Sequence, residues 1–126
     1  MILGIGIDIV HVPRIVQLVS RRGRERFAKR ILSQQEHVEF YEKFPRSACQ
    51  DNDQLQYLVS RWCVKEAVYK ALYPRHKLVW KDVTVWKDRG KPMLSIMNGT
   101  EYGIMHSHLS LSHDGEYTTA MVILES

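Results

Sequence analysis

Two acidic residues of this 126-residue chain stand among apolar neighbours. Asp8 ends an apolar run in which Gly4 and Gly6 alternate with isoleucines. One interpretation is a carboxylate that turns out to solvent or caps a following turn. The other is a metal ligand or general base at a rigid strand end, where two glycines let another backbone or a ligand approach closely.

Glu66 is the second acid. On a helical wheel it lies about 20° from Leu55, in the middle of an apolar stripe. A carboxylate there must be paired, protonated or metal-bound, because an isolated buried charge is strongly unfavourable. Lys70 follows at i+4 and is the expected partner. The alternative is an ordinary Glu–Lys helix pair that contributes only ~0.3–0.5 kcal/mol.

A basic segment runs from Arg14 to Arg30, with Glu25 as its one acid. Phe27 places apolar surface beside the charge. A solvated helix face is one interpretation, and a docking surface for nucleic acid, anionic lipid or an acidic protein is the other. The positive residues of the segment are Arg14, Arg21, Arg22, Arg24, Arg26, Lys29 and Arg30.

The first half of the chain predicts one strand and three helices that position these groups. Residues 2–9 are typical of a buried strand. Residues 14–22 predict a helix that ends near Gly23, and Ser33 with Glu36 forms a capping box for a helix through Lys43. After a polar loop at residues 47–53, a long helix is expected over residues 54–73. Its expected core stripe comprises Leu55, Leu58, Val59, Trp62 and Tyr69.

Beyond Pro74 the apolar period changes to two, which predicts strands. One hairpin is expected around residues 88–91 and a second around Asp114 and Gly115, with a turn at Asn98 and Gly99 between them. Strand, helices and then several strands indicate an α+β class. No internal repeat or linker divides the chain, so we predict a single domain over residues 1–126.

Composition narrows the class further. The chain is 44% hydrophobic and 25% charged, which argues against disorder, and no apolar run approaches the ~20 residues of a membrane span. Two cysteines, Cys49 and Cys63, are too few for a disulfide scaffold and favour a reducing compartment. Cys63, between Trp62 and Val64, is interpreted as a packing residue. The net charge of +4 favours an acidic partner.

Two segments resemble the signatures of the 4′-phosphopantetheinyl transferases, of the holo-acyl-carrier-protein synthase type. One is the strand ending at Asp8; the other is residues 61–70, where Trp62, Lys65, Glu66 and Lys70 have the family's spacing. Further similar segments lie in the family's order over residues 2–124: 26–33 with Glu36, 90–92 and 109–113. The stretch between residues 97 and 109 is short, so the family's helix before the last hairpin is expected to be reduced.

The resemblance implies a long central helix packed on an antiparallel sheet. It also implies transfer of the phosphopantetheine arm of coenzyme A to a serine of an apo acyl carrier protein, with release of 3′,5′-ADP, in support of fatty acid synthesis. Catalysis would fall to Asp8, Glu66 and Lys70. Asp8 and Glu66 would hold Mg²⁺, and Glu66 is the candidate base for the serine. Lys70 would neutralise phosphate charge.

The resemblance assigns two further groups of residues. Arg61, Lys65, Lys70, Gly90, Lys91, Pro92 and His113 would bind coenzyme A. Arg14, Arg26, Phe27 and Arg30 would dock the acidic carrier protein. His113 has an alternative interpretation as a turn residue, and His106 and His108 lack a third ligand at zinc-finger spacing. Small members of the family resemble homotrimers, so self-association is expected.

Two other interpretations compete with this assignment. A small basic nucleic-acid-binding module would explain the charge but would leave Asp8 and Glu66 without a role. An inactive structural trimer is disfavoured because Asp8, Glu66 and Lys70 are all present. We expect no nucleic-acid or membrane partner. Residues 73–80 resemble the mitochondrial members, which favours the mitochondrial matrix over a bacterial-type cytoplasm. Because the first strand begins at residue 2, no detachable transit peptide is expected.

Overall fold

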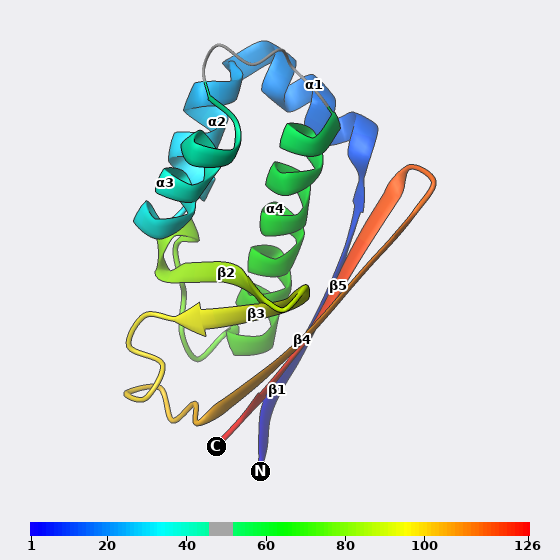
Figure 1. Cartoon of the computed structure of the whole chain (residues 1–126). Helices are drawn as coiled ribbons and strands as arrows, with labels where there is room; N and C mark the ends of the chain where they lie inside the picture. Colours follow the sequence, from blue (N-terminus) through cyan, green and yellow to red (C-terminus); the bar gives the residue numbers. More distant parts are fainter. Residues whose placement is uncertain (46–51) are drawn as a thin grey trace.

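A computed structural model describes residues 1–45 and 52–126 and confirms the α+β class (Figure 1). The loop predicted at residues 47–53 falls largely outside the described residues. Most predicted elements are present, and the short helix α2 is an addition to them. In chain order the elements are β1 (Ile2–His11), α1 (Val12–Arg22), α2 (Arg24–Ile31), α3 (Gln34–Lys43), α4 (Asn52–Leu72), a 3-10 turn (Trp80–Asp82), β2 (Val83–Asp88), β3 (Lys91–Ile96), β4 (His106–Asp114) and β5 (Tyr117–Glu125).

Three strands form an antiparallel sheet in the order β1-β5-β4, and β2 and β3 form a separate hairpin. Figure 1 shows the three-stranded sheet nearly edge-on, with α4 along one face. Directly opposed residues share a face, so Asp8, opposite Ala120, lies on the α4 side. The other face carries the exposed side chains of Ile5, Ile7 and Ile9. The prediction of a buried first strand is therefore wrong for one of its two faces.

Two glycines of β1 let α4 approach the sheet at backbone distance. A Cβ on Gly6 would lie 1.7 Å from the carbonyl oxygen of Ala67, and one on Gly4 would lie 1.9 Å from that of Ala71. Any side chain at these positions would separate the helix from the strand. The glycines therefore set the distance between Asp8 on β1 and the end of α4.

We expect Gly6→Ala to destabilise the fold by about 3 kcal/mol or more, because the added methyl group overlaps backbone that cannot move without separating α4 from β1. Urea unfolding monitored by circular dichroism measures this change. Wild-type stability of the variant would contradict the close contact.

The capping box is confirmed at the start of α3. The backbone N–H of Ser33 donates to Glu36 Oε1 at 2.8 Å, and the Glu36 N–H donates to Ser33 Oγ at 3.3 Å. Both N-terminal amides are thereby satisfied, as the local sequence predicted.

The predicted core stripe of α4 is only partly correct. Leu58 and Val59 are buried, but Leu55 and Trp62 are half-buried and Tyr69 is exposed. The strands β1 and β5 pack against one side of α4, and α1, α2 and β2 pack against other sides. Buried residues therefore occur all around the helix, and its helical periodicity does not identify a single buried face. The face that carries Glu66 borders a cavity instead of the deepest core.

Candidate active site

Asp8 is fixed through its own main chain. Thr119 Oγ1 donates to the Asp8 carbonyl oxygen at 2.8 Å, and Cys63 Sγ lies 3.5 Å from the same oxygen. The Asp8 side chain is 13% exposed. Its carboxylate is thus held at a defined place on the sheet and keeps a small part of its surface in contact with solvent.

Lys70 reaches Asp8 from the last turn of α4. Its Nζ donates to Asp8 Oδ1 and to the Ile7 carbonyl oxygen, both at 3.0 Å. This ion pair joins α4 to β1. The sequence had predicted Glu66, on the same helix, as the partner of Lys70. Half of the Lys70 side chain is exposed, so its ammonium is also available to an anion from solvent.

Glu66 lies one turn before Lys70 and feels the same charges. Burial and the neighbouring Asp8 carboxylate raise the pKa of Glu66, while Lys70 and Arg14 oppose that shift. Two carboxylates from different elements therefore share one electrostatic environment with one lysine. A carboxylate with a raised pKa is suited to accept a proton.

A cavity of about 310 Å³ opens beside Glu66. Its walls are mainly apolar and come from the segment that enters β2, with Lys65 and Tyr69 of α4 on the other side. The segment contributes Leu78, Val79, Trp80 and Val83. The carboxylate thus borders a space suited to an uncharged, extended group.

A second cavity, of about 480 Å³, lies along the first half of α4, and its mixed lining includes several basic side chains and one acid, Asp53. It brings together four of the predicted cofactor-binding residues: Arg61, Gly90, Pro92 and His113. Lys43 and Lys87 add two further cations to its lining. Such a lining is suited to an anionic ligand with several phosphates.

Arg61 is pre-positioned in this second cavity. Its guanidinium carbon lies 3.7 Å from the centre of the Tyr57 ring, and its Nη1 donates to Ser60 Oγ at 3.1 Å. Nη2 lies 3.6 Å from Glu39 Oε1. The side chain is almost fully buried, yet its Nε has no hydrogen-bond partner within the described residues. Glu36 Oε2 lies 3.9 Å from this buried Nε, and the Arg61 side chain adds its positive charge to the lining of the second cavity.

Comparison with known proteins identifies the family of the chain. Residues 4–122 match the family model of the 4'-phosphopantetheinyl transferase superfamily. The chain belongs to this superfamily. The family assignment expected from the sequence is thereby confirmed.

Relatives of this transferase cover it over nearly its whole length. A holo-[acyl-carrier-protein] synthase of Wolbachia from Brugia malayi is 38% identical over 126 residues, covering 98% of this chain and 96% of that protein. The mitochondrial 4'-phosphopantetheinyl transferase B of Aspergillus fumigatus is 36% identical over 141 residues, covering 96% of this chain and 92% of that protein.

Solved structures of similar proteins share the fold. The holo-[acyl-carrier-protein] synthase of Neisseria meningitidis has a TM-score of 0.84 at 30% identity, with all of both chains covered. That of Bacillus anthracis, solved in complex with CoA (3',5'-ADP), has a TM-score of 0.77 at 30% identity, covering 100% of this chain and 98% of that chain.

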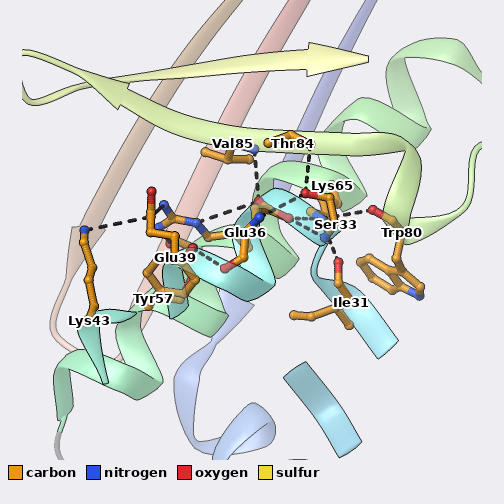
Figure 2. A network of polar contacts seen from close by, with 12 residues as sticks. Ile31, Ser33, Glu36, Glu39, Lys43, Tyr57, Lys65, Trp80, Thr84 and Val85 are labelled. Atoms are coloured by element: carbon orange, nitrogen blue, oxygen red, sulfur yellow. Dashed lines mark hydrogen bonds and ion pairs between the residues drawn. The ribbon is translucent and has the colours of Figure 1, made fainter. Parts of the chain in front are cut away.

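Lys65 of the transferase does not lie as its predicted role requires. Its side chain is buried, and its Nζ donates to Glu36 Oε1 at 2.5 Å, to the Ile31 carbonyl at 2.6 Å and to the Trp80 carbonyl at 3.0 Å (Figure 2). Burial lowers the pKa of the Lys65 ammonium, and the Glu36 carboxylate opposes that shift. Three acceptors use all three donors, so this arrangement leaves none for the phosphate contact predicted from the sequence.

Phe27 also differs from its expected role in docking. It is 3% exposed, and its ring stacks on Trp62 with 5.5 Å between centroids. A side chain in the core cannot contact a carrier protein, so the prediction is corrected: Phe27 anchors α2 to α4. The basic residues keep their expected position, since Arg14, Arg26 and Arg30 are exposed, and Val16 supplies exposed apolar surface on α1.

We expect Phe27→Ala to destabilise the transferase by about 3–5 kcal/mol through loss of packing. Once corrected for the folded fraction, its KM for a carrier protein is expected to stay unchanged. Thermal unfolding and steady-state kinetics on the same sample measure both quantities. A raised carrier KM in the fully folded variant would restore Phe27 to the docking surface.

The local sequence gave little indication of some residues around the second cavity. Lys43 ends α3 and Lys87 lies near the β2–β3 turn, so only the tertiary fold places them beside Arg61. Lys91, which the sequence predicted to bind coenzyme A, is exposed at the start of β3. Its neighbours Gly90 and Pro92 line the second cavity. Cys63 is a buried free thiol, and burial with the nearby Asp8 raises its pKa to about 12, so it is not a nucleophile at neutral pH.

Proposed function

We propose that this transferase is a holo-[acyl-carrier-protein] synthase that moves the 4′-phosphopantetheine arm of coenzyme A to a serine of an apo acyl carrier protein, releasing 3′,5′-ADP. The observation that carries the proposal is the convergence of Asp8, Glu66 and Lys70, with Glu66 at the edge of an apolar cavity, in a chain that belongs to this superfamily. Fatty acid synthesis is the process that such an activity supports.

Coenzyme A has a multiply charged nucleotide end and an uncharged arm, and the two cavities differ in the same way. The basic cavity with Arg61, Gly90, Pro92 and His113 is proposed for the nucleotide and its phosphates. The cavity beside Glu66 suits the arm. The coenzyme A complex of the Bacillus anthracis relative supports this substrate.

Asp8 and Glu66 fit a Mg²⁺ ion as carboxylate ligands. Within the described residues no cluster of three or more His, Cys, Asp or Glu side chains could hold a metal, so further ligands would come from substrate oxygens and water. Burial and the negative charge of Asp8 raise the pKa of Glu66, and a divalent cation would relieve the repulsion between the two carboxylates. When bound, Mg²⁺ would neutralise charge on the pyrophosphate under attack.

The protein's own groups then have distinct tasks. Glu66 accepts the proton of the attacking serine, directly or through a water, for which its raised pKa suits it. Lys70, released from Asp8 or shared with it, stabilises negative charge on the phosphate oxygens. Reaction at phosphorus depends mainly on such alignment and charge stabilisation.

Self-association would cover the apolar face of the sheet. The exposed side chains of Ile5, Ile7, Ile9 and Met121 lie on the face opposite α4, in adjacent strands. An apolar patch of this kind is unfavourable in water and marks an interaction site. A homotrimer is the assembly that we propose, with coenzyme A held between subunits.

The compartment is proposed from the relatives. No helix within the described ranges combines the length and the apolar character needed to cross a bilayer. The similar proteins include bacterial synthases and a mitochondrial fungal enzyme. We favour the mitochondrial matrix, with a bacterial-type cytoplasm as the alternative.

Incubation with an apo acyl carrier protein, coenzyme A and Mg²⁺ tests the proposal. Mass spectrometry of the carrier protein should show the mass of the phosphopantetheine arm on one serine, and 3′,5′-ADP should form in equal amount. An unmodified carrier protein under conditions where a related synthase is active would refute the function.

A further inference from the structure

A carboxylate that the proposed chemistry does not use is buried at the centre of the helical layer. Glu36 is 2% exposed and Lys65 is 3% exposed, and their side chains meet at 2.5 Å (Figure 2). Of the Glu36 side chain, the capping box requires only the bond accepted from the Ser33 N–H. The additional contacts of Glu36 therefore need another explanation.

Glu36 joins three elements through its two oxygens. Oε1 accepts from Ser33 of its own helix and from Lys65 of α4. Oε2 accepts from the backbone N–H of Val85 in β2 at 3.0 Å and lies 3.9 Å from Nε of Arg61. The Glu36 side chain of α3 thus fixes the position of α4 relative to β2.

The partners of Glu36 border both proposed binding cavities. Lys65 directly precedes Glu66 in α4 and lines the same cavity. One of the two carbonyl acceptors of Lys65, that of Trp80, belongs to the facing wall of that cavity. Arg61 lines the basic cavity on the other flank. Lys65, which is held by Glu36, is therefore a direct polar link between the helix that carries Glu66 and the wall opposite it.

We propose that Glu36 is a positioning residue for the transferase reaction: through Lys65 it fixes Glu66 and the Trp80 wall at the separation that the reacting substrate requires. This inference rests on the proposed function. It assigns to Lys65 a role through its neighbours, in place of the phosphate contact expected from the sequence.

A purely structural role is the competing explanation, and it makes a different prediction. A buried ion pair is often no more stabilising than a neutral or apolar pair of similar volume, but loss of one partner leaves an uncompensated charge. If the pair serves stability alone, replacing both partners should restore stability and activity together. If the pair positions the site, stability should recover without activity.

The experiment compares Glu36→Gln, Lys65→Met and the double variant. Each single variant is expected to unfold at a lower temperature than the wild type, and the double variant to regain part of that loss. At a temperature where all are folded, kcat is expected to fall by about 10- to 100-fold in the singles and to stay low in the double, because small displacements of reacting groups reduce rates strongly.

A second measurement reports the position of the cavity wall that carries Trp80, independently of enzyme activity. Trp80 of the wall lies against Trp62 of α4, with ring centroids 4.6 Å apart. Their coupled circular dichroism signal is expected to weaken in Lys65→Met and in the double variant, because the Trp80 carbonyl loses its ammonium partner. The control variant is Glu42→Gln, an exposed position on the same helix, which should match the wild type in stability, kcat and indole signal.

Two outcomes would overturn the inference. One is a double variant whose kcat and indole signal recover along with its stability. The other is a folded single variant with wild-type kcat and indole signal. If the wild-type protein modifies no carrier protein, the proposed function fails instead, and the indole signal alone still tests whether the pair holds the wall.

Discussion

Replacing Asp8 with Asn, or Glu66 with Gln, is expected to lower kcat for arm transfer by about 10³-fold or more, since each change removes a carboxylate proposed to hold Mg²⁺ and the second also removes the proposed base. Asp8 also loses its ion pair with Lys70. Both variants should remain folded, because Thr119 holds Asp8 through its main-chain carbonyl and Glu66 borders a cavity.

The pKa of Glu66 supplies an internal check on folding. Because this pKa is raised in the folded protein, the folded state binds a proton more tightly than the unfolded state, and stability falls as pH rises through the range between the two values. Removing the titrating group should therefore leave Glu66→Gln at least as stable as the wild type at pH 7 without Mg²⁺. Thermal melts and single-turnover rates measure the two effects. A folded Asp8→Asn enzyme with near-normal, Mg²⁺-dependent activity would contradict the proposed role of Asp8 in catalysis.

The sequence singled out Asp8, Glu66 and Lys70 because they lie in two short segments that resemble the signatures of the family. Asp8 follows two glycines that a close backbone contact requires, and Glu66 and Lys70 are neighbours on one helix face. The capping box at Ser33 is likewise a short-range pattern. What the pattern missed is that Lys70 pairs across elements with Asp8, since no local rule describes a contact between residues 62 positions apart.

The errors concern residues whose environment depends on packing. Phe27 lies within a basic segment of the sequence, but the helix α2 places its ring against Trp62, whereas Arg26 and Arg30 are exposed to solvent. Lys65 carries a charge in a signature segment, yet the fold supplies buried acceptors from Glu36 and two carbonyl groups. Helical periodicity cannot separate such positions on α4, because several elements surround it.

Charge reversal at Arg26 and Arg30 of α2 is expected to raise the KM for the carrier protein by about 10- to 100-fold, because electrostatic attraction speeds encounter with an acidic partner. Both residues are exposed, and neither lines a described cavity. The KM for coenzyme A should therefore stay within about twofold of wild type. Raising the salt concentration from ~50 to ~200 mM should imitate the substitutions in the wild-type enzyme, since screening shortens the range of the attraction.

Arg14 is expected to affect both the docking of the carrier protein and the titration of Glu66. It is exposed on α1, and its charge also opposes the raised pKa of Glu66. Arg14→Glu should consequently raise the pKa of Glu66 further, so that the acidic limb of the kcat–pH profile moves to higher pH. Arg26→Glu with Arg30→Glu should leave that limb in place and change the carrier KM alone.

A matched control separates a docking surface from an effect of net charge. Arg75→Glu with Lys77→Glu makes the same change in charge at exposed positions beyond α4, and it should leave the carrier KM near wild type. The nucleic-acid interpretation predicts instead that Arg26 and Arg30 govern oligonucleotide affinity, with log K falling linearly with log salt. Kinetics with both substrates and an oligonucleotide titration on the same Arg26→Glu/Arg30→Glu protein decide between them. An unchanged KM for the carrier protein together with a large loss of oligonucleotide affinity would show that this surface does not dock the carrier protein.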